Sequence, residues 1–181
     1  MDEEYNKKVA ELKSKIGKFP DFPKKGILFW DIFSAISHGP TCKLLQDLLV
    51  QTVRCKYPEV EVVIGLESRG FLFAFSLAAE LKIGCVPVRK KGKLPGEVRS
   101  HKYDLEYGSD VLEIQVDSVR PGMKCLVVDD LIATGGSITA AIELLKSCGA
   151  NVLGCLVVME LQSLNGRKNI TVPVHSLIQY D

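Results

Sequence analysis

Long apolar runs, paired cysteines and an excess of charge of one sign are all missing from this 181-residue sequence. No apolar run approaches the roughly 20 residues that span a bilayer, and residues 1–15 are too polar for an ordinary secretory signal. Lysine and arginine total 23 against 22 aspartate and glutamate residues, which leaves no general basic field for nucleic acid or an anionic membrane. We therefore expect a cytoplasmic protein with no nucleic-acid or membrane partner, in which any anion site is local.

Metal-binding and redox patterns are also missing. The six cysteines lie singly, with no C-x-x-C pair and no nearby histidine at metal-ligand spacing. The three histidines are far apart in the sequence and match no catalytic triad. We expect reduced thiols that pack as small apolar side chains, and we assign no histidine a catalytic role.

The sequence does contain a regular succession of apolar strands and helices. Its length and its 46% of hydrophobic residues suit one compact domain, 1–181. Near-continuous apolar strands that alternate with helices predict an α/β fold, in which a parallel sheet is covered on both faces. The expected strands are 60–65, 85–88, 124–129 and 152–159, and the helices between them include 70–81 and 137–147.

The N-terminal part departs from this alternation. Tyr5, Val9, Leu12 and Ile16 recur at helical spacing and predict a short amphipathic helix. In residues 19–31 the prolines forbid a helix and aromatic residues are dense, which predicts an ordered covering segment. A second helix is expected to begin at Thr41, a capping residue that precedes a leucine-rich face.

A second irregular stretch lies in the middle of the chain. Residues 89–102 are basic, contain glycines and show almost no apolar pattern, so they are expected to form a mobile loop. Residues 103–115 alternate in polarity around Gly108 and predict a hairpin. The lysines and arginines of the loop could be solvated charges, as most charge runs are.

The most specific segment is Val127 to Ser137, which reads Val-Val-Asp-Asp-Leu-Ile-Ala-Thr-Gly-Gly-Ser. Its strand should end at the carboxyl edge of the sheet, where Asp129 and Asp130 can accept hydrogen bonds from ribose hydroxyls. The turn that follows opens a helix, so unpaired N–H groups and the positive end of the helix dipole converge on one phosphate. Such a combination is more specific than a lone glycine motif. It predicts a ribose phosphate site formed by Asp129, Asp130, Ala133, Thr134, Gly135, Gly136 and Ser137.

The same segment resembles the phosphoribosyl-pyrophosphate motif of type I phosphoribosyltransferases. Further segments, in the right order over nearly the whole chain, resemble the adenine phosphoribosyltransferase family: Phe19–Pro23, Gly65–Phe71, Arg89–Gly96, Leu105–Gly108 and Leu177–Tyr180. The resemblance implies a type I phosphoribosyltransferase-like parallel sheet flanked by helices, a small N-terminal hood at about 17–35 and a flexible catalytic loop at about 89–108. It also implies a homodimer that performs purine salvage, transferring the 5-phosphoribosyl group of phosphoribosyl pyrophosphate to adenine with AMP and pyrophosphate as products.

The resemblance assigns a role to each matching position. Glu106, Lys93 and Arg69 are the expected catalytic residues. Pyrophosphate is expected to bind Glu67, Ser68, Arg69, Lys90 and Lys93, in a turn where the family often holds a non-proline cis peptide. Adenine is expected to bind Ile27, Leu28, Phe29, Trp30 and Leu161, although the family often carries arginine at position 30. Mg²⁺ is the implied cofactor, held mainly through the substrate near Asp129 and Asp130 with no direct protein ligand.

Each assignment has a plainer alternative in the residues themselves. Arg69 could form a surface ion pair, Phe29 could belong to the core, and Glu106 could be a solvated surface residue. A regulator that senses phosphoribosyl pyrophosphate would keep the fold without the chemistry, but it would be expected to show a basic face or an additional domain. A phosphoribosyltransferase for hypoxanthine, guanine, xanthine or orotate is disfavoured by the matches at Leu105–Gly108 and Phe19–Pro23.

Overall fold

The computed structural model describes residues 2–104 and 108–181. The chain divides into two compact units, 1–55 and 56–181. Whether the two act as the single domain expected for 1–181 stays a prediction. Among the described residues, no helix has both the length and the apolar character needed to cross a bilayer.

The first unit pairs helices with a small hairpin. Its elements are α1 (Glu3–Lys15), β1 (Gly17–Pro20), β2 (Leu28–Asp31), α2 (Ile32–Ile36) and α3 (Gly39–Lys56), whose last residue belongs to the second unit. The side chain of Asp2 caps α1 by accepting a hydrogen bond from the Tyr5 N–H, and the Tyr5 hydroxyl lies 2.7 Å from the Thr52 hydroxyl of α3. The hairpin β1–β2 is antiparallel and falls in the segment expected to be ordered and non-helical.

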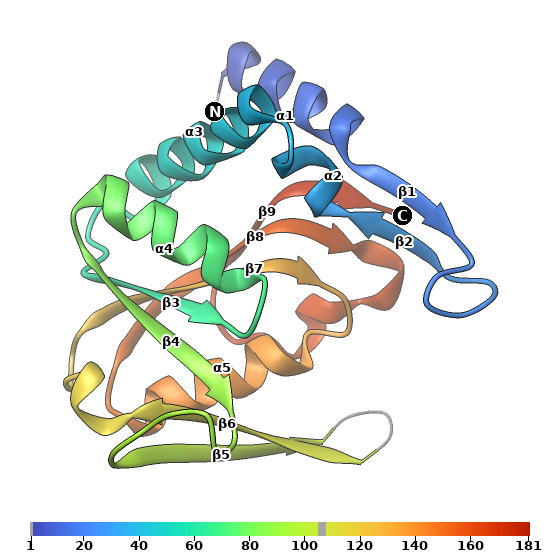
Figure 1. Ribbon diagram of the computed structural model, residues 1–181. Helices are drawn as coiled ribbons and strands as arrows, with labels where there is room; N and C mark the ends of the chain where they lie inside the picture. Colours follow the sequence, from blue (N-terminus) through green and yellow to red (C-terminus); the bar gives the residue numbers. More distant parts are fainter. Residues whose placement is uncertain (1, 105–107) are drawn as a thin grey trace. The chain divides into compact units, whose positions relative to one another are not determined.

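The second unit is built on a sheet with the strand order β5-β6-β4-β3-β7-β8-β9 (Figure 1). The strands from β4 to β9 in this order are parallel, whereas β6 and β5 are antiparallel additions at one edge. Their bounds are β3 (Val62–Leu66), β4 (Gly84–Lys90), β5 (Val98–Asp104), β6 (Ser109–Gln115), β7 (Lys124–Ile132), β8 (Asn151–Leu161) and β9 (Val174–Tyr180). Short 3-10 helices η1 (Val116–Ser118), η2 (Gln162–Leu164) and η3 (Gly166–Asn169) lie in the connections.

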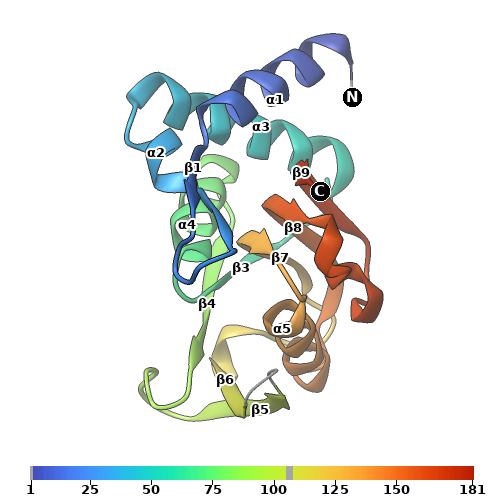
Figure 2. The same cartoon turned by 90° about the vertical axis from the view of Figure 1, so that its right-hand side faces the viewer.

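Two helices of this unit, α4 (Gly70–Leu81) and α5 (Gly136–Ser147), cover opposite faces of the sheet (Figures 1 and 2). Helix α4 connects β3 to β4 on one side of the sheet centre, and α5 connects β7 to β8 on the other. Because parallel crossovers are right-handed, connections that leave in opposite directions place their helices on opposite faces. The carboxyl ends of the neighbouring strands β3 and β7 therefore form a switch point, the position at which open α/β sheets bind ligands.

The expected α/β class, with a parallel sheet covered on both faces, is confirmed, and helix α4 has the bounds that the sequence predicts. Strand β7 runs past Asp129 to Ile132, because it continues to pair with β8 after its pairing with β3 ends at Val128. Strand β9 and helix α2 were not expected.

Two local expectations were wrong. Helix α3 begins at Gly39, so Thr41 is not its cap: the Thr41 residue is buried and its hydroxyl lies 3.0 Å from Nδ1 of His38. The stretch 98–102 is not irregular, because it pairs with β6 along the whole of β5. Residues 91–97 are left outside the strands, and their mobility stays a prediction.

Candidate active site

The predicted phosphate loop follows β7 and forms a small hollow of about 120 Å³. Gly135 has φ +81°, a conformation that side chains with a Cβ rarely adopt, and a Cβ there would also overlap the carbonyl oxygen of Gly166. Thr134 and Ser137 are exposed, and α5 begins directly at Gly136. The hollow is lined by Asp129, Leu131, Ala133, Thr134, Gly135, Gly136, Ser137 and Ile138, which include six of the seven residues expected to hold the ribose phosphate.

The seventh, Asp130, is buried at 5% exposure and faces a cation. Its Oδ2 atom accepts a hydrogen bond from Nε of Arg69 at 2.5 Å, which joins the end of β7 to the turn before α4. Arg69 therefore does form an ion pair, which was the plainer alternative for it, but the pair lies at the switch point between the two turns that are expected to bind the substrate. Two groups expected to bind ribose and pyrophosphate are thus in direct contact.

Asp129 carries a carboxyl group in an unfavourable electrostatic setting. Burial raises its pKa well above the ordinary value of 3.8, and the negative charge of Asp130 raises it further, while Arg69 opposes both effects. The Oδ1 atom of Asp129 accepts a hydrogen bond from the Asp130 N–H at 2.9 Å. The buried carboxyl group of Asp129 consequently lowers the stability of the folded protein as the pH rises above its ordinary pKa.

We expect Asp129→Asn to raise the melting temperature at pH 7 while it weakens the binding of ribose phosphates. A carboxyl group with a raised folded-state pKa stabilises the protein below its ordinary pKa and loses that contribution as the pH rises through the folded value. The melting temperature of the parent should therefore fall more between pH 4 and pH 7 than that of Asp129→Asn. Parallel pH profiles for the two proteins would contradict the assignment of a raised pKa to Asp129.

The predicted pyrophosphate turn joins β3 to α4. The peptide bond between Glu67 and Ser68 is cis, as the family resemblance led us to expect. The turn lies against the end of β7: a Cβ at Gly70 would come within 2.8 Å of both the Asp129 Oδ1 atom and the Val128 carbonyl oxygen. Glycine at this position is required for the two turns to approach each other.

Glu67 is the centre of a charge cluster formed with β4 and the loop after it. Its carboxylate accepts hydrogen bonds from Nζ of Lys93 at 2.5 Å, the Lys90 N–H at 3.0 Å and Nε of Arg89 at 3.3 Å. Burial alone would raise the pKa of Glu67, but these donors outweigh it and hold the pKa at about 2. Glu67 therefore stays ionised and attaches the loop residue Lys93 to the pyrophosphate turn.

The third expected cation, Lys90, has a partner of its own. Its Nζ lies 2.9 Å from Oδ2 of Asp110 on β6. Arg69, Lys90 and Lys93 thus each have a carboxylate in contact, and each would exchange or share this partner on binding a phosphate oxygen. The structure brings Arg69 next to Asp130 of the predicted ribose site, and Lys93 next to Glu67.

The expected adenine residues 27–30 lie in the hairpin of the first unit. Phe29 is half-buried and meets the ring of Phe22 edge-on, with ring centroids 5.1 Å apart. The Lys18 ammonium lies 5.0 Å from the ring centre of Trp30, at the position where the family often carries arginine. The hairpin thus presents aromatic side chains suited to stacking on a flat base, and its role stays a prediction.

Two further predicted site residues are Leu161 and Glu106. Leu161 is the last residue of β8, a half-buried position at the carboxyl edge of the sheet. Glu106 lies outside the described residues, so its role also stays a prediction. Sequence reasoning missed Tyr103 on β5, whose hydroxyl lies 3.5 Å from the Ser137 hydroxyl.

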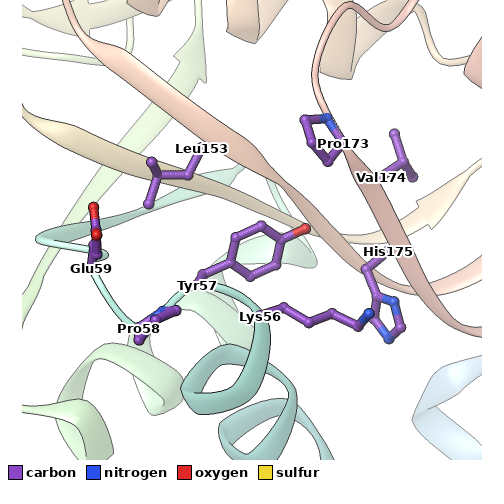
Figure 3. A pocket seen from close by; sticks show the side chains of 8 residues that line it. All are labelled: Lys56, Tyr57, Pro58, Glu59, Leu153, Pro173, Val174 and His175. Atoms are coloured by element: carbon purple, nitrogen blue, oxygen red, sulfur yellow. The ribbon is translucent and has the colours of Figure 1, made fainter. Parts of the chain in front are cut away.

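A cavity of about 530 Å³ lies elsewhere in the second unit (Figure 3). Leu153 lies near the amino end of β8 and Val174 begins β9, so this cavity is at the opposite edge of the sheet from the switch point. Burial, with the positive charges of Lys56 and Arg167, lowers the pKa of His175 to about 4 and keeps its imidazole neutral at physiological pH. The lining residues are Lys56, Tyr57, Pro58, Glu59, Leu153, Pro173, Val174 and His175, and they include none of the expected site residues.

Comparisons with known proteins agree with this geometry. Residues 37–178 match a family model described as a phosphoribosyl transferase domain. The chain is 57% identical over 173 residues to an adenine phosphoribosyltransferase of Drosophila pseudoobscura pseudoobscura, covering 96% of each chain. It is 48% identical to the enzyme of that name from Gluconacetobacter diazotrophicus, covering 96% of this chain and 97% of the relative.

Solved structures give the same result. The adenine phosphoribosyltransferase of Saccharomyces cerevisiae, complexed with adenine and D-2,5-dideoxy-2,5-imino-altritol 1,6-bisphosphate, superposes with a TM-score of 0.91 at 43% identity, over 94% of this chain and 98% of that chain. The enzyme of Giardia lamblia, complexed with 9-deazaadenine, gives a TM-score of 0.85 at 34% identity, over 96% of this chain and 98% of that chain.

Proposed function

From the premise that this chain belongs to the adenine phosphoribosyltransferases, we propose that its switch point is the active site for the transfer of a 5-phosphoribosyl group to adenine. The substrates are adenine and phosphoribosyl pyrophosphate, and the products are AMP and pyrophosphate. The observation that carries the proposal is the juxtaposition of two anion-binding turns at the ends of adjacent strands. The Arg69–Asp130 ion pair, at 2.5 Å, joins them.

The reaction develops charge on two sides of the ribose, at the leaving pyrophosphate and at the incoming base. Adenine N9 bonds to the ribose C1 as the bond from C1 to pyrophosphate breaks, and the bonding electrons leave with pyrophosphate. The ribose passes through an oxocarbenium-like state, so the leaving group needs cations close by. Arg69, Lys90 and Lys93 supply them, while Asp129 and Asp130 hold the ribose hydroxyls. Glu106 is proposed either to accept the N9 proton or to donate a hydrogen bond to N7 that makes N9 more acidic.

Mg²⁺ is the proposed cofactor, and it fits this site as an ion carried by the substrate. Asp129 and Asp130 are hard oxygen donors of the kind that Mg²⁺ accepts. Asp130 is already paired with Arg69, and in the described part of the chain no cluster of three or more His, Cys, Asp or Glu residues could hold a metal. The ion would neutralise pyrophosphate charge, and the two aspartates would lie beside it.

A homodimer and a cytoplasmic location complete the proposal. Helix α4 exposes Leu72 and Phe75, with 50% and 70% of their area accessible, and such an apolar face supports contact with a second copy of the chain. Light scattering on the purified protein tests the dimer, with Phe75→Glu expected to yield monomers. The proposed cytoplasmic location is supported by the singly placed cysteines.

A direct assay tests the activity. Pyrophosphate release would be measured with phosphoribosyl pyrophosphate, Mg²⁺ and each purine base in turn. We expect release with adenine and none above background with hypoxanthine, guanine or xanthine. Release with an oxopurine in place of adenine would reassign the base, and a protein that binds phosphoribosyl pyrophosphate without releasing pyrophosphate would favour the sensor alternative.

Lys93→Ala is expected to lower turnover more than it weakens AMP binding. AMP lacks the pyrophosphate over which Lys93 is proposed to close, so the lysine acts chiefly as the leaving group departs. Steady-state kinetics and AMP titration measure the two effects, and Lys91→Ala, an exposed lysine of the same loop, is the matched control. Equal losses in turnover and AMP affinity would make Lys93 a static partner of Glu67 instead.

A further inference from the structure

The phosphate loop is held from behind by a segment of the chain that sequence reasoning did not single out. This segment is η3 (Gly166–Asn169), which follows β8. Gly166 is buried, and a Cβ there would overlap the Ala133 carbonyl oxygen and come within 2.6 Å of the Ile132 side chain. From the other side, a Cβ at Gly135 would overlap the Gly166 carbonyl oxygen. The two glycines permit backbone-to-backbone contact along the wall of the loop.

The next residue, Arg167, fixes this contact. Its guanidinium makes a two-pronged ion pair with Glu160, in which Nε and Nη2 each lie 2.5 Å from a different carboxylate oxygen. It also donates to the Val174 carbonyl oxygen and the Ser176 hydroxyl, each at 2.9 Å. The ion pair thus joins η3 to the ends of β8 and the start of β9.

Glu160 is buried so deeply that its carboxylate needs a cation as a partner, and Arg167 supplies it. It is 4% exposed, and it accepts from the Ser176 hydroxyl at 2.5 Å as well as from Arg167. Hydrogen bonds from Arg167 hold the pKa of Glu160 below its ordinary value, although burial opposes them. A buried carboxylate without its cation is strongly unfavourable, so the backbone at Arg167 has little freedom to move.

We propose that Gly166 and Arg167 are positioning residues for the 5-phosphate of the substrate, acting through the phosphate loop. The inference rests on the proposed function. Backbone N–H groups bind a phosphate well only when they are held in place, and a loop with glycines at 135 and 136 has little stiffness of its own. The Glu160–Arg167 pair supplies that stiffness from outside the loop, without contact with the substrate.

The test compares two small substitutions in η3, behind the loop, with one on strand β8. Gly166→Ala forces the wall away from Ala133, and Arg167→Lys keeps the charge that Glu160 needs but cannot make the two-pronged pair. Gly154→Ala is the matched control, because its Cβ would also meet backbone and ring atoms at 2.8 Å, at the amino half of β8. Each variant would be titrated with ribose 5-phosphate, and its melting temperature and its Michaelis constants for both substrates would be measured.

We expect Gly166→Ala to weaken ribose 5-phosphate binding by about tenfold or more, the cost of roughly one charge-assisted hydrogen bond, and Arg167→Lys to weaken it less. The Michaelis constant for phosphoribosyl pyrophosphate should rise in parallel, while that for adenine changes by less than about twofold. Gly154→Ala should lower the melting temperature without changing ribose 5-phosphate affinity.

Several outcomes would overturn the inference. Parent-like affinity for ribose 5-phosphate in Gly166→Ala would do so, as would equal losses of affinity in Gly166→Ala and Gly154→Ala, since these would reflect general destabilisation. A Gly166→Ala chain that does not fold leaves Arg167→Lys to decide by the same affinity measurement. If the parent itself neither binds ribose 5-phosphate nor releases pyrophosphate with adenine, the proposed function fails, which is a separate result.

Discussion

Glu106→Leu is expected to lower turnover with adenine by about 10²- to 10⁴-fold, the contribution typical of a positioned acid or base. Adenine must lose its N9 proton as the new bond forms. A carboxyl group can take that proton, or it can donate a hydrogen bond to N7 and thereby make N9 more acidic. Leucine can do neither, so we expect the variant to bind phosphoribosyl pyrophosphate normally and to turn over slowly.

Glu106→Gln separates the two routes. An amide can still donate a hydrogen bond to N7 but cannot accept a proton, so a small loss in this variant favours the hydrogen-bonding route. Single-turnover kinetics report the chemical step directly. If Glu106→Leu turned over adenine at the parent rate, Glu106 would be a surface residue and the base chemistry would need another group.

Asp130→Asn is expected to weaken the binding of both phosphoribosyl pyrophosphate and AMP by about 10- to 150-fold. A hydrogen bond to a charged group contributes about 1.5–3 kcal/mol, and each 1.4 kcal/mol is a factor of ten in affinity. The substitution removes a charged acceptor for a ribose hydroxyl, and it also removes the partner of Arg69, whose Nε lies 2.5 Å from the carboxylate. Arg69 would then be less well held for pyrophosphate.

Isothermal titration with the two ligands measures this effect. Glu61→Gln is a suitable control, because it removes a carboxylate that is ion-paired with Arg120 at 2.8 Å and hydrogen-bonded to the Lys124 N–H, at the amino end of the sheet. Its affinities should match those of the parent. Unchanged affinities in Asp130→Asn would place the sugar away from the end of β7.

Sequence patterns predicted the elements whose formation depends mainly on residues that are close together in the chain. Helix α4 and strand β3 are short, apolar and bounded by glycine or polar turns, so periodicity alone places them closely. The phosphate loop was also predictable, because its glycines and hydroxyl residues stand next to one another in the chain. The assignment of the base came from family resemblance and not from spacing or composition.

Contacts between distant residues were the part that the sequence did not reveal. Arg69 and Asp130 are 61 positions apart, and Glu67 and Lys93 are 26 apart, so their ion pairs depend on the strand order. The sequence around Gly166 does not indicate that this residue packs against Gly135 in the folded chain. Strand β5 was mistaken for loop because its edge position tolerates polar residues, which hides the usual alternation.

The pairing of β3 with β7 has a consequence for the placement of the two turns that follow these strands. Gly65 lies opposite Val128, so the strands that lead to the predicted pyrophosphate turn and to the predicted phosphate loop are separated there by one strand spacing, about 4.8 Å. That spacing is maintained by hydrogen bonds inside a buried sheet and not by either loop. Changes in the loops could tune the affinity of each predicted anion site, but the separation of the two strands from which they extend is set by the strand pairing. The sheet therefore fixes the points from which the two predicted anion-binding turns leave the fold.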